Sequence, residues 1–219
     1  MAELATISLF SDANLLHYYR LEDVSDNKGS SNLTNNNTVA FNPAKYTNGA
    51  DFGASNPNKY LSRTDAIGIT NATNWAVPFW VKLQTEIGAG NYTFFNINFP
   101  TSSYCQLYYS YNAGTRRLVV DQGGGGPTYN ITLGTANFYH MVMMRNGANV
   151  YLYINGTQVA SGALGTAGGG LNTFGIGADG AGSNPSSAII DDLGVFNRYL
   201  TDAEILTLYK EQSGFLAIL

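Results

Sequence analysis

The stretch "NVYLYINGTQVASG", residues 149–162, places an Asn-Gly pair between two strand-like runs. The first run alternates aliphatic residues with tyrosines, in the order Val150, Tyr151, Leu152, Tyr153, Ile154. This period of two is typical of a half-buried strand. The Asn155-Gly156 pair tolerates the positive φ angles of a type I′ turn. The stretch therefore predicts a β-hairpin whose return strand covers residues 157–161.

The residues before this hairpin repeat the same pattern. The run "FYHMVMM" at 138–144 is apolar, and "RNGAN" at 145–149 supplies another Asn-Gly turn. Residues 139–161 are thus predicted to form a three-stranded meander. His140 lies inside this strand-like run, so a packed and hydrogen-bonded histidine is the expected reading.

Similar runs predict strands along the rest of the chain, at 17–22, 58–63, 75–83, 92–99, 104–111, 116–122, 129–133, 174–178 and 188–196. The turn spacing suits a β-sandwich better than βαβ units. The expectation is an all-β, two-sheet antiparallel sandwich in one domain over residues 1–219. Clusters at 25–38, 123–128 and 165–170 are predicted loops by composition. Pro78 cannot donate to a ladder and should mark a bulge or an edge.

The segment after residue 200 changes character and predicts a short closing helix. Thr201 and Glu204 fit a Thr-x-x-Glu capping box, and Lys210 falls in the last turn. Ile205, Leu208 and Tyr209 would form one apolar stripe. We expect this stripe to lie across a sheet edge or the end of the sandwich.

Composition narrows the classes of function. The chain has 219 residues, 44% hydrophobic and 12% charged, with 15 Tyr, 11 Phe and 25 Gly, which agrees with strands and tight turns. With 11 Lys and Arg and a net charge of -4, it lacks the basic footprint of a nucleic-acid binder. No segment reaches the length of a membrane span, and no signal peptide is evident. Cys105 is the single cysteine, so neither an internal disulfide nor a cysteine zinc site is expected.

Several motifs occur together in a family order. They are "YYRLED" (18–23), "YTNGADFG" (46–53), "FWVKL" (79–83), "FYHMVMMRNGANVYLYINGTQVASG" (138–162) and "AIIDDLGVFNRYLTDAEILTLYKE" (188–211). In this succession the chain resembles the laminin-G-like, concanavalin A-like lectin/glucanase jelly rolls of bacteria and phages. The resemblance implies two curved antiparallel sheets of about a dozen strands. It does not imply one function, because such folds hold glycan binders, adhesion modules, virion components and glycosidases.

Catalysis is not expected. The glucanases of this fold carry a Glu-x-Asp-x-x-Glu strand, which this sequence lacks. Asp191 and Asp192 are adjacent, so on a regular strand their side chains would point to opposite faces and could not act as a pair. The chain is therefore predicted to be a nonenzymatic module.

A structural calcium ion is a candidate cofactor. The resemblance implies a site that combines an aspartate after the first strand with the aspartate of the Ile-Asp strand, which here are Asp26 and Asp191. Carboxylate oxygens are the ligands that calcium prefers. The alternative is that Asp26 caps a turn and Asp191 accepts backbone hydrogen bonds.

Carbohydrate binding is the favoured function. If Cys105, Leu107 and Tyr109 face the core, then Tyr104, Gln106 and Tyr108 face solvent. Aromatic rings beside hydrogen-bonding groups are suited to a glycan or surface polysaccharide. Exposed tyrosines can equally serve as cross-strand packing partners.

Assembly is the second hypothesis. The end segments "MAELATISLF" and "SGFLAIL" are apolar and lie outside the family pattern. Residues 215–219 would be costly to expose and could dock on another copy of the chain or on virion proteins. This predicts a component of a phage particle, such as a capsid decoration or fibre protein, attached through its termini. We expect the protein to be located on a virion or cell surface rather than to have a metabolic role in the cytoplasm.

Overall fold

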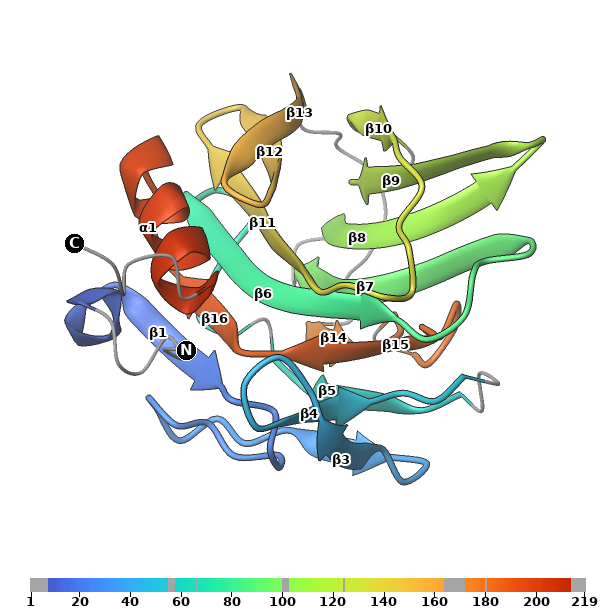
Figure 1. Ribbon diagram of the computed structural model, residues 1–219. Helices are drawn as coiled ribbons and strands as arrows, with labels where there is room; N and C mark the ends of the chain where they lie inside the picture. Colours follow the sequence, from blue (N-terminus) through green and yellow to red (C-terminus); the bar gives the residue numbers. More distant parts are fainter. Residues whose placement is uncertain are drawn as a thin grey trace.

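The computed structural model describes residues 8–54, 58–65, 67–99, 103–123, 125–163, 172–179 and 181–213. Two antiparallel sheets, one nine-stranded and one seven-stranded, stack face to face, and one helix follows them (Figure 1). This confirms the predicted all-β sandwich with a short C-terminal helix.

The nine-stranded sheet has the order β13-β12-β11-β6-β15-β4-β3, with β16 pairing both β6 and β1. Its strands are β1 (Leu15–Tyr19), β3 (Ala40–Pro43), β4 (Asn48–Asp51), β6 (Trp75–Leu83), β11 (Tyr139–Asn146), β12 (Asn149–Ile154), β13 (Thr157–Ala163), β15 (Ala188–Asp191) and β16 (Leu193–Phe196).

The seven-stranded sheet has the order β10-β9-β8-β7-β14-β5-β2. Its strands are β2 (Thr34–Asn36), β5 (Tyr60–Arg63), β7 (Gly90–Phe99), β8 (Ser103–Asn112), β9 (Thr115–Asp121), β10 (Thr128–Asn130) and β14 (Thr173–Ile176). The short strand β2 lies inside a segment predicted to be a loop, and that prediction is wrong there. Its side chains are largely exposed, so only backbone pairing with β5 makes it a strand.

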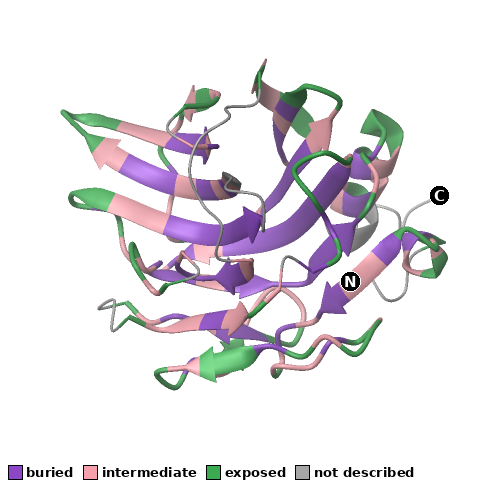
Figure 2. Cartoon of the chain, turned by 180° about the vertical axis from the view of Figure 1, so that it is seen from behind, coloured by how far each residue is buried: buried purple, intermediate pink, exposed green. Residues whose placement is uncertain are grey.

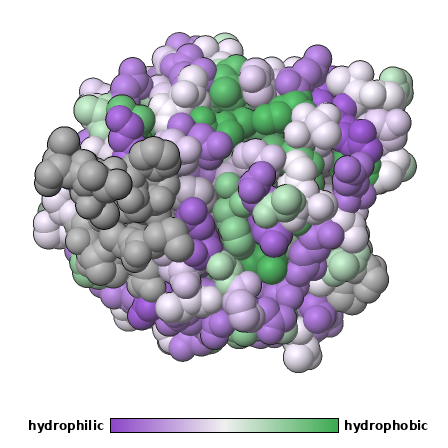
Figure 3. Space-filling view, viewed as in Figure 1, coloured by the Kyte–Doolittle hydropathy of each residue, from purple (hydrophilic) through white to green (hydrophobic). Residues whose placement is uncertain are grey.

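The main core lies between the sheets, and it follows from the alternation along each strand. Phe95, Ile97 and Phe99 of β7 are buried in it, and Phe79 of β6 packs edge-on against Phe95 with ring centroids 5.6 Å apart. Figure 2 shows buried strand centres and more exposed turns. Figure 3 shows hydrophilic residues over much of one side of the molecule, with apolar residues gathered near its middle.

The predicted meander and its turn are confirmed. β11, β12 and β13 are consecutive antiparallel neighbours. Asn155 and Gly156 have φ angles of 49° and 81°, the left-handed values that a type I′ turn requires. The local sequence therefore carries enough information to specify this part of the sheet.

The C-terminal helix α1 (Asp202–Ser213) covers the outer face of the nine-stranded sheet, where Ile205 and Leu208 are fully buried. They join Val142, Met144 and other residues in a second apolar cluster. The expected placement at an edge or an end of the sandwich was wrong. β6 is buried along almost its whole length, so both of its faces need cover, and the helix supplies it on one side.

The helix begins as predicted. The Thr201 backbone N–H donates to Glu204 Oε2 at 2.8 Å, and the Glu204 N–H donates to Thr201 Oγ1 at 3.3 Å. Arg198 holds Glu204 from outside the helix, at 2.7 Å from Nη2 to Oε1, and also pairs with Asp12. The capping box thus links the helix start to the segment before β1.

Pro78 lies in a strand paired on both sides, so it does not mark an edge. β6 pairs with β15 through Trp80 and Asp191, and with β16 through Ala76 and Phe196. The pairing register shifts by one residue between β15 and β16. Asp192 is therefore an extra residue that forms a β-bulge, and its φ of 56° agrees with that geometry. The even-numbered residues of β6 direct their backbone N–H groups toward β15 and β16. Gln84, directly after β6, shows this direction, because its N–H donates to Ser187 O at 2.9 Å. The donor that Pro78 lacks would therefore point at the bulge.

Candidate functional site

A row of small and polar residues crosses the outer face of the seven-stranded sheet. The strand registers place these residues directly opposite one another in the order Ser62, Gly175, Asn96, Gln106, Asp121. They come from five strands, of which β7, β8 and β9 follow one another in the chain whereas β5 and β14 are distant from them in sequence. Because their neighbours in each strand point into the core, these residues point outward.

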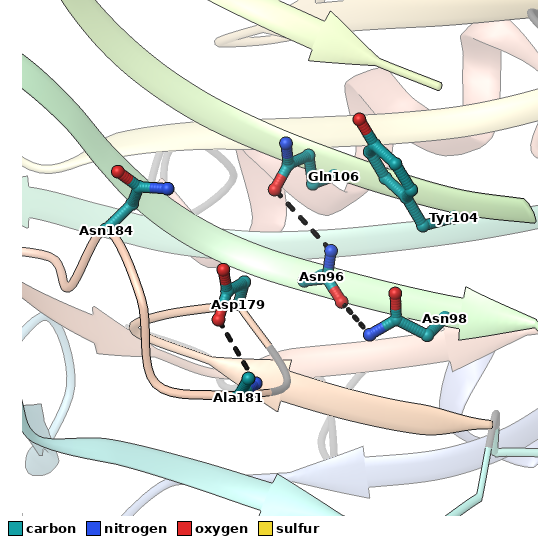
Figure 4. A pocket seen from close by; sticks show the side chains of 7 residues that line it. All are labelled: Asn96, Asn98, Tyr104, Gln106, Asp179, Ala181 and Asn184. Carbon is teal, nitrogen blue, oxygen red and sulfur yellow. Dashed lines mark hydrogen bonds between the residues drawn. The ribbon is translucent and has the colours of Figure 1, made fainter. Parts of the chain in front are cut away.

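Hydrogen bonds join the middle of this row into one network (Figure 4). Asn98 Nδ2 donates to Asn96 Oδ1 at 2.6 Å, and Asn96 Nδ2 lies 3.5 Å from Gln106 Oε1. Gln106 Nε2 and the Tyr104 hydroxyl both donate to Asp121 Oδ2, each at 3.1 Å. The side chains are thereby held in one arrangement before any ligand arrives.

The loop between β14 and β15 forms a wall beside this network. The Asp179 carboxylate accepts the N–H groups of Ala181 at 3.1 Å and Ser183 at 2.7 Å. Asn184 O accepts the Thr93 N–H at 3.0 Å, which ties the loop to β7. Loop and sheet enclose a pocket of about 270 Å³, lined by Asn96, Asn98, Tyr104, Gln106, Asp179, Ala181 and Asn184.

The structure separates the three ligand-binding residues predicted from sequence. Tyr104, Gln106 and Tyr108 share the outward face of β8, whereas Cys105, Leu107 and Tyr109 are fully buried. Tyr104 and Gln106 line the pocket, but Tyr108 does not. Tyr108 lies opposite Thr93 and Val119 instead, and burial raises the pKa of its hydroxyl. This position fits the alternative of cross-strand packing, and ligand binding by Tyr108 stays a prediction.

Sequence reasoning missed most of the pocket. Asn96 and Asn98 alternate with Phe95, Ile97 and Phe99 in one strand, and that pattern of amides inside an apolar run was an available signal. Nothing comparable marks Asp179, Ala181 or Asn184. They reach the pocket only because their loop folds over the sheet.

A second hollow of about 420 Å³ lies where β7 begins and β8 ends, lined by Ala89, Gly90, Asn91, Ser110, Tyr111, Asn112 and Ala113. Two neighbouring strand ends and the residues next to them supply this lining. The first pocket has convergent side chains from two strands and a loop, held by hydrogen bonds to β9. We therefore regard the first pocket as the candidate site.

Asp26 has a buried side chain that is surrounded by donors. His17 Nδ1 lies 2.7 Å from Oδ2. Backbone N–H groups donate to the carboxylate at 2.9–3.1 Å, from Tyr18, Lys28, Gly29 and Ser31. Burial alone would raise the pKa of this carboxyl, but these donors together lower it below its ordinary value. The contacts match the turn-capping alternative, and calcium binding stays a prediction.

Asp191 has a separate set of partners. Its Oδ2 accepts the backbone N–H groups of Lys45 at 3.0 Å and Tyr46 at 3.1 Å. Asp192 accepts the hydroxyl of Tyr18, a member of the cluster beneath the helix. The expectation of opposite faces was wrong, because the bulge at Asp192 turns both carboxylates toward the outer side of the nine-stranded sheet. Within the described ranges, no three His, Cys, Asp or Glu side chains are grouped to hold a metal ion.

His140 is packed as predicted but is not hydrogen-bonded through its ring. It is buried against Trp80, with ring centroids 5.1 Å apart, and stacks on Tyr209 at 6.2 Å. Neither ring nitrogen has a hydrogen-bond partner among the residues that the structure describes. Burial, with a smaller effect from Lys45, lowers its pKa to about 3. The ring acts as a neutral apolar side chain.

Comparison with known proteins defines the family. The sequence pattern of the "Concanavalin A-like lectin/glucanases superfamily" matches residues 52–206, which is more than half of the chain. The chain belongs to this superfamily. No curated protein matches it.

Solved structures share the fold at low sequence identity. Domain 4 of an extracellular arabinanase from Geobacillus stearothermophilus, solved with arabinotriose, is 21% identical with a TM-score of 0.69, over 91% of this chain and 100% of that chain. The binding domain of botulinum neurotoxin DC, solved in complex with SialylT, is 13% identical with a TM-score of 0.65, over 91% and 52%. The binding domain of Paraclostridial Mosquitocidal Protein 1 is 16% identical with a TM-score of 0.62, over 90% and 52%. This chain spans about half of each toxin binding domain.

No helix in the described part of the chain combines the length and the apolar character needed to cross a membrane. The assembly hypothesis depends on both end segments of the chain. Most of these segments, residues 1–7 and 214–219, lies outside the described residues.

Proposed function

We propose that this chain is a noncatalytic carbohydrate-binding module and that the pocket between β7, β8 and the 179–184 loop is its binding site. The observation that carries the proposal is the fixed network of Asn96, Asn98 and Gln106 beside the Tyr104 ring. Amides both donate and accept hydrogen bonds, as sugar hydroxyls do. An aromatic ring can pack on the apolar face of a sugar.

Two further observations support the proposal. The solved relative from the arabinanase carries arabinotriose, and the toxin domain was solved with SialylT. The pocket volume of about 270 Å³ lies just under the roughly 300–1,000 Å³ of ligand pockets in general. It therefore suits one sugar unit or the end of a chain.

A binding role, rather than hydrolysis, is supported by how the acidic groups are used. Asp121 accepts hydrogen bonds from Tyr104 and Gln106, and Asp179 accepts two from its own loop. Each carboxylate thus positions part of the pocket. Hydrolysis of a glycoside needs one carboxyl group to donate a proton and a second to act on the sugar. Incubation with labelled oligosaccharides should release no product.

The test is a glycan array followed by calorimetry on the best ligand. Tyr104→Ala and Gln106→Ala should each weaken binding by about tenfold or more, because they remove a ring or a hydrogen-bonding group. Tyr199→Ala is the matched control, since Tyr199 is 41% exposed and does not line the pocket. A folded protein that binds nothing on the array, or binding that survives both pocket variants, would overturn the proposal.

Attachment to a virion or cell surface through the termini stays a prediction. Light scattering of the full chain and of a chain ending at residue 213 tests it directly. Oligomers that dissociate on this truncation would support the assembly role. A monomer in both cases would contradict it.

A further inference from the structure

We infer that the binding surface continues from the candidate pocket along β8 to the second hollow, so that its ligand is a linear glycan of several sugar units; the inference rests on the proposed function. Alternation along β8 directs five side chains to the outer face, and these are Tyr104, Gln106, Tyr108, Ser110 and Asn112. The first two line the candidate pocket, and the last two line the second hollow. The two hollows therefore lie along one face of the same strand, with Tyr108 between them.

The neighbouring strand β7 connects the same two hollows. Asn96 lies opposite Gln106 and lines the pocket, whereas Asn91 lies opposite Ser110 and lines the second hollow. All four side chains can donate and accept hydrogen bonds, as sugar hydroxyls do. Ser110 is four positions beyond Gln106, which at ~3.3 Å per residue is a backbone distance of about 13 Å. A single sugar unit in the pocket does not reach the second hollow, but a chain of linked units does.

Tyr108 supplies an aromatic ring midway along this path. Its cross-strand neighbours, Thr93 of β7 and Val119 of β9, are smaller side chains and are buried, whereas Tyr108 is only partly buried. Part of the ring is therefore accessible from the outer face. Burial and Asp121 raise the pKa of its hydroxyl, and Arg117 lowers it, which agrees with a ring near both of these outward residues of β9. The apolar face of a sugar can pack on such a ring.

Binding along this path should depend on the length of the glycan. A chain that occupies the pocket can also contact Tyr108 and the second hollow without a second association step, because its units are covalently linked. Affinity should therefore rise by about tenfold or more between the shortest oligosaccharide that binds and one that reaches the second hollow. Units beyond that length should add little.

The experiment is calorimetry on the full chain with a size series of linear oligosaccharides. The probes are arabino-, xylo- and gluco-oligosaccharides, each series beginning with the monosaccharide. We expect the affinity of the series that binds to rise with length and then reach a plateau, with one long oligosaccharide bound per protein molecule. Two long oligosaccharides bound per molecule would show that the hollows act separately and would overturn the inference.

Variants then assign the gain in affinity to the path. Tyr108→Ala and Asn91→Ala should each weaken binding of the plateau oligosaccharide by about five- to tenfold. Both should leave the affinity for the shortest binder unchanged, which also shows that the variants are folded. Tyr108→Phe keeps the ring and should retain most of the affinity. Asn197→Ala is the matched control for Asn91→Ala, because Asn197 is exposed and follows β16 of the other sheet.

The outcomes separate this inference from the proposed function. If affinity does not rise with length, or if Tyr108→Ala and Asn91→Ala leave long-chain binding unchanged, while Gln106→Ala weakens it, the pocket binds glycans but the inferred path is wrong. If Gln106→Ala leaves the binding of every length unchanged, the candidate pocket is not the site and both proposals fail. If no probe binds the folded protein, both fail as well.

Discussion

Gly182 lies directly against the ring of Tyr60. A β-carbon at residue 182 would come within 2.8 Å of Tyr60 Cε1, and the glycine has a φ of 84°. Tyr60 belongs to β5 of the seven-stranded sheet, whereas Gly182 belongs to the loop that walls the pocket. This contact sets how closely the loop approaches the sheet.

Gly182→Ala should therefore weaken glycan binding, by about threefold or more, because the loop or the Tyr60 ring must move. Calorimetry with the ligand found on the array measures the effect. Gly114→Ala is the matched control: Gly114 has the same φ of 84°, but an added β-carbon would meet nothing within 4 Å. Both substitutions place an alanine at the same positive φ. Equal affinities in the two variants would show that the loop position does not matter.

The carboxylate of Asp26 should stabilise the fold in a pH-dependent manner. Asp26→Asn should lower the free energy of unfolding by about 2 kcal/mol at neutral pH, because an amide satisfies the surrounding donors less well than a carboxylate. The pKa of Asp26 is lowered from 3.8, so its contribution is present above that pH and is lost as the pH falls further. Urea denaturation of both proteins at several pH values should show the gap between them shrink below about pH 4. A gap that stays constant to pH 2 would rule out this account.

Calcium addition should leave the Tm unchanged if the N–H donors around Asp26 and Asp191 already satisfy these carboxylates. An ion would have to displace donors that lie 2.9–3.1 Å from the oxygens of Asp26. Thermal melts in EDTA and in millimolar calcium test this. A calcium-dependent rise in Tm that disappears in both Asp26→Asn and Asp191→Asn would instead establish the ion predicted from sequence.

His140 should make the protein less stable in mild acid. Its pKa of about 3 in the folded state lies below the value of about 6.5 expected in the unfolded chain. Stability is therefore complete above pH 6.5 and falls as the pH drops toward 3, by at most about 1.4 kcal/mol per pH unit. His140→Phe removes this titration and should flatten the dependence between pH 6 and 4 in urea denaturation. Identical slopes for the two proteins would contradict the buried neutral state.

Thr201→Ala should destabilise the fold by about 1 kcal/mol, because it removes the side-chain half of the capping box. Helix α1 covers a second apolar cluster, so the loss should appear in global unfolding. Thr201→Ser keeps the hydroxyl and should retain most of the stability. A Thr201→Ala protein as stable as the parent would show that packing alone holds the helix.

Local sequence patterns determined several features of this protein. Alternation of apolar and polar residues predicted most strands, Asn155-Gly156 predicted its turn, and Thr201 with Glu204 predicted the start of the helix. These features depend on interactions among residues that are close in the chain, so their signals are visible in a short window. The outward direction of Tyr104 and Gln106 followed from the same alternation.

Only the tertiary structure decided where the candidate site lies. Asn96 meets Gln106 and Gly175 because β7 pairs with both β8 and β14, and β14 is far from β7 in sequence. Asp179 reaches the pocket because its loop returns over the sheet. Strict alternation would place the side chains of Asp191 and Asp192 on opposite faces of the sheet, but the bulge at Asp192 turns both to the same face. Strand order, register and loop return are set by packing of the whole sandwich, since the burial of two layers selects one arrangement among many that are locally equivalent.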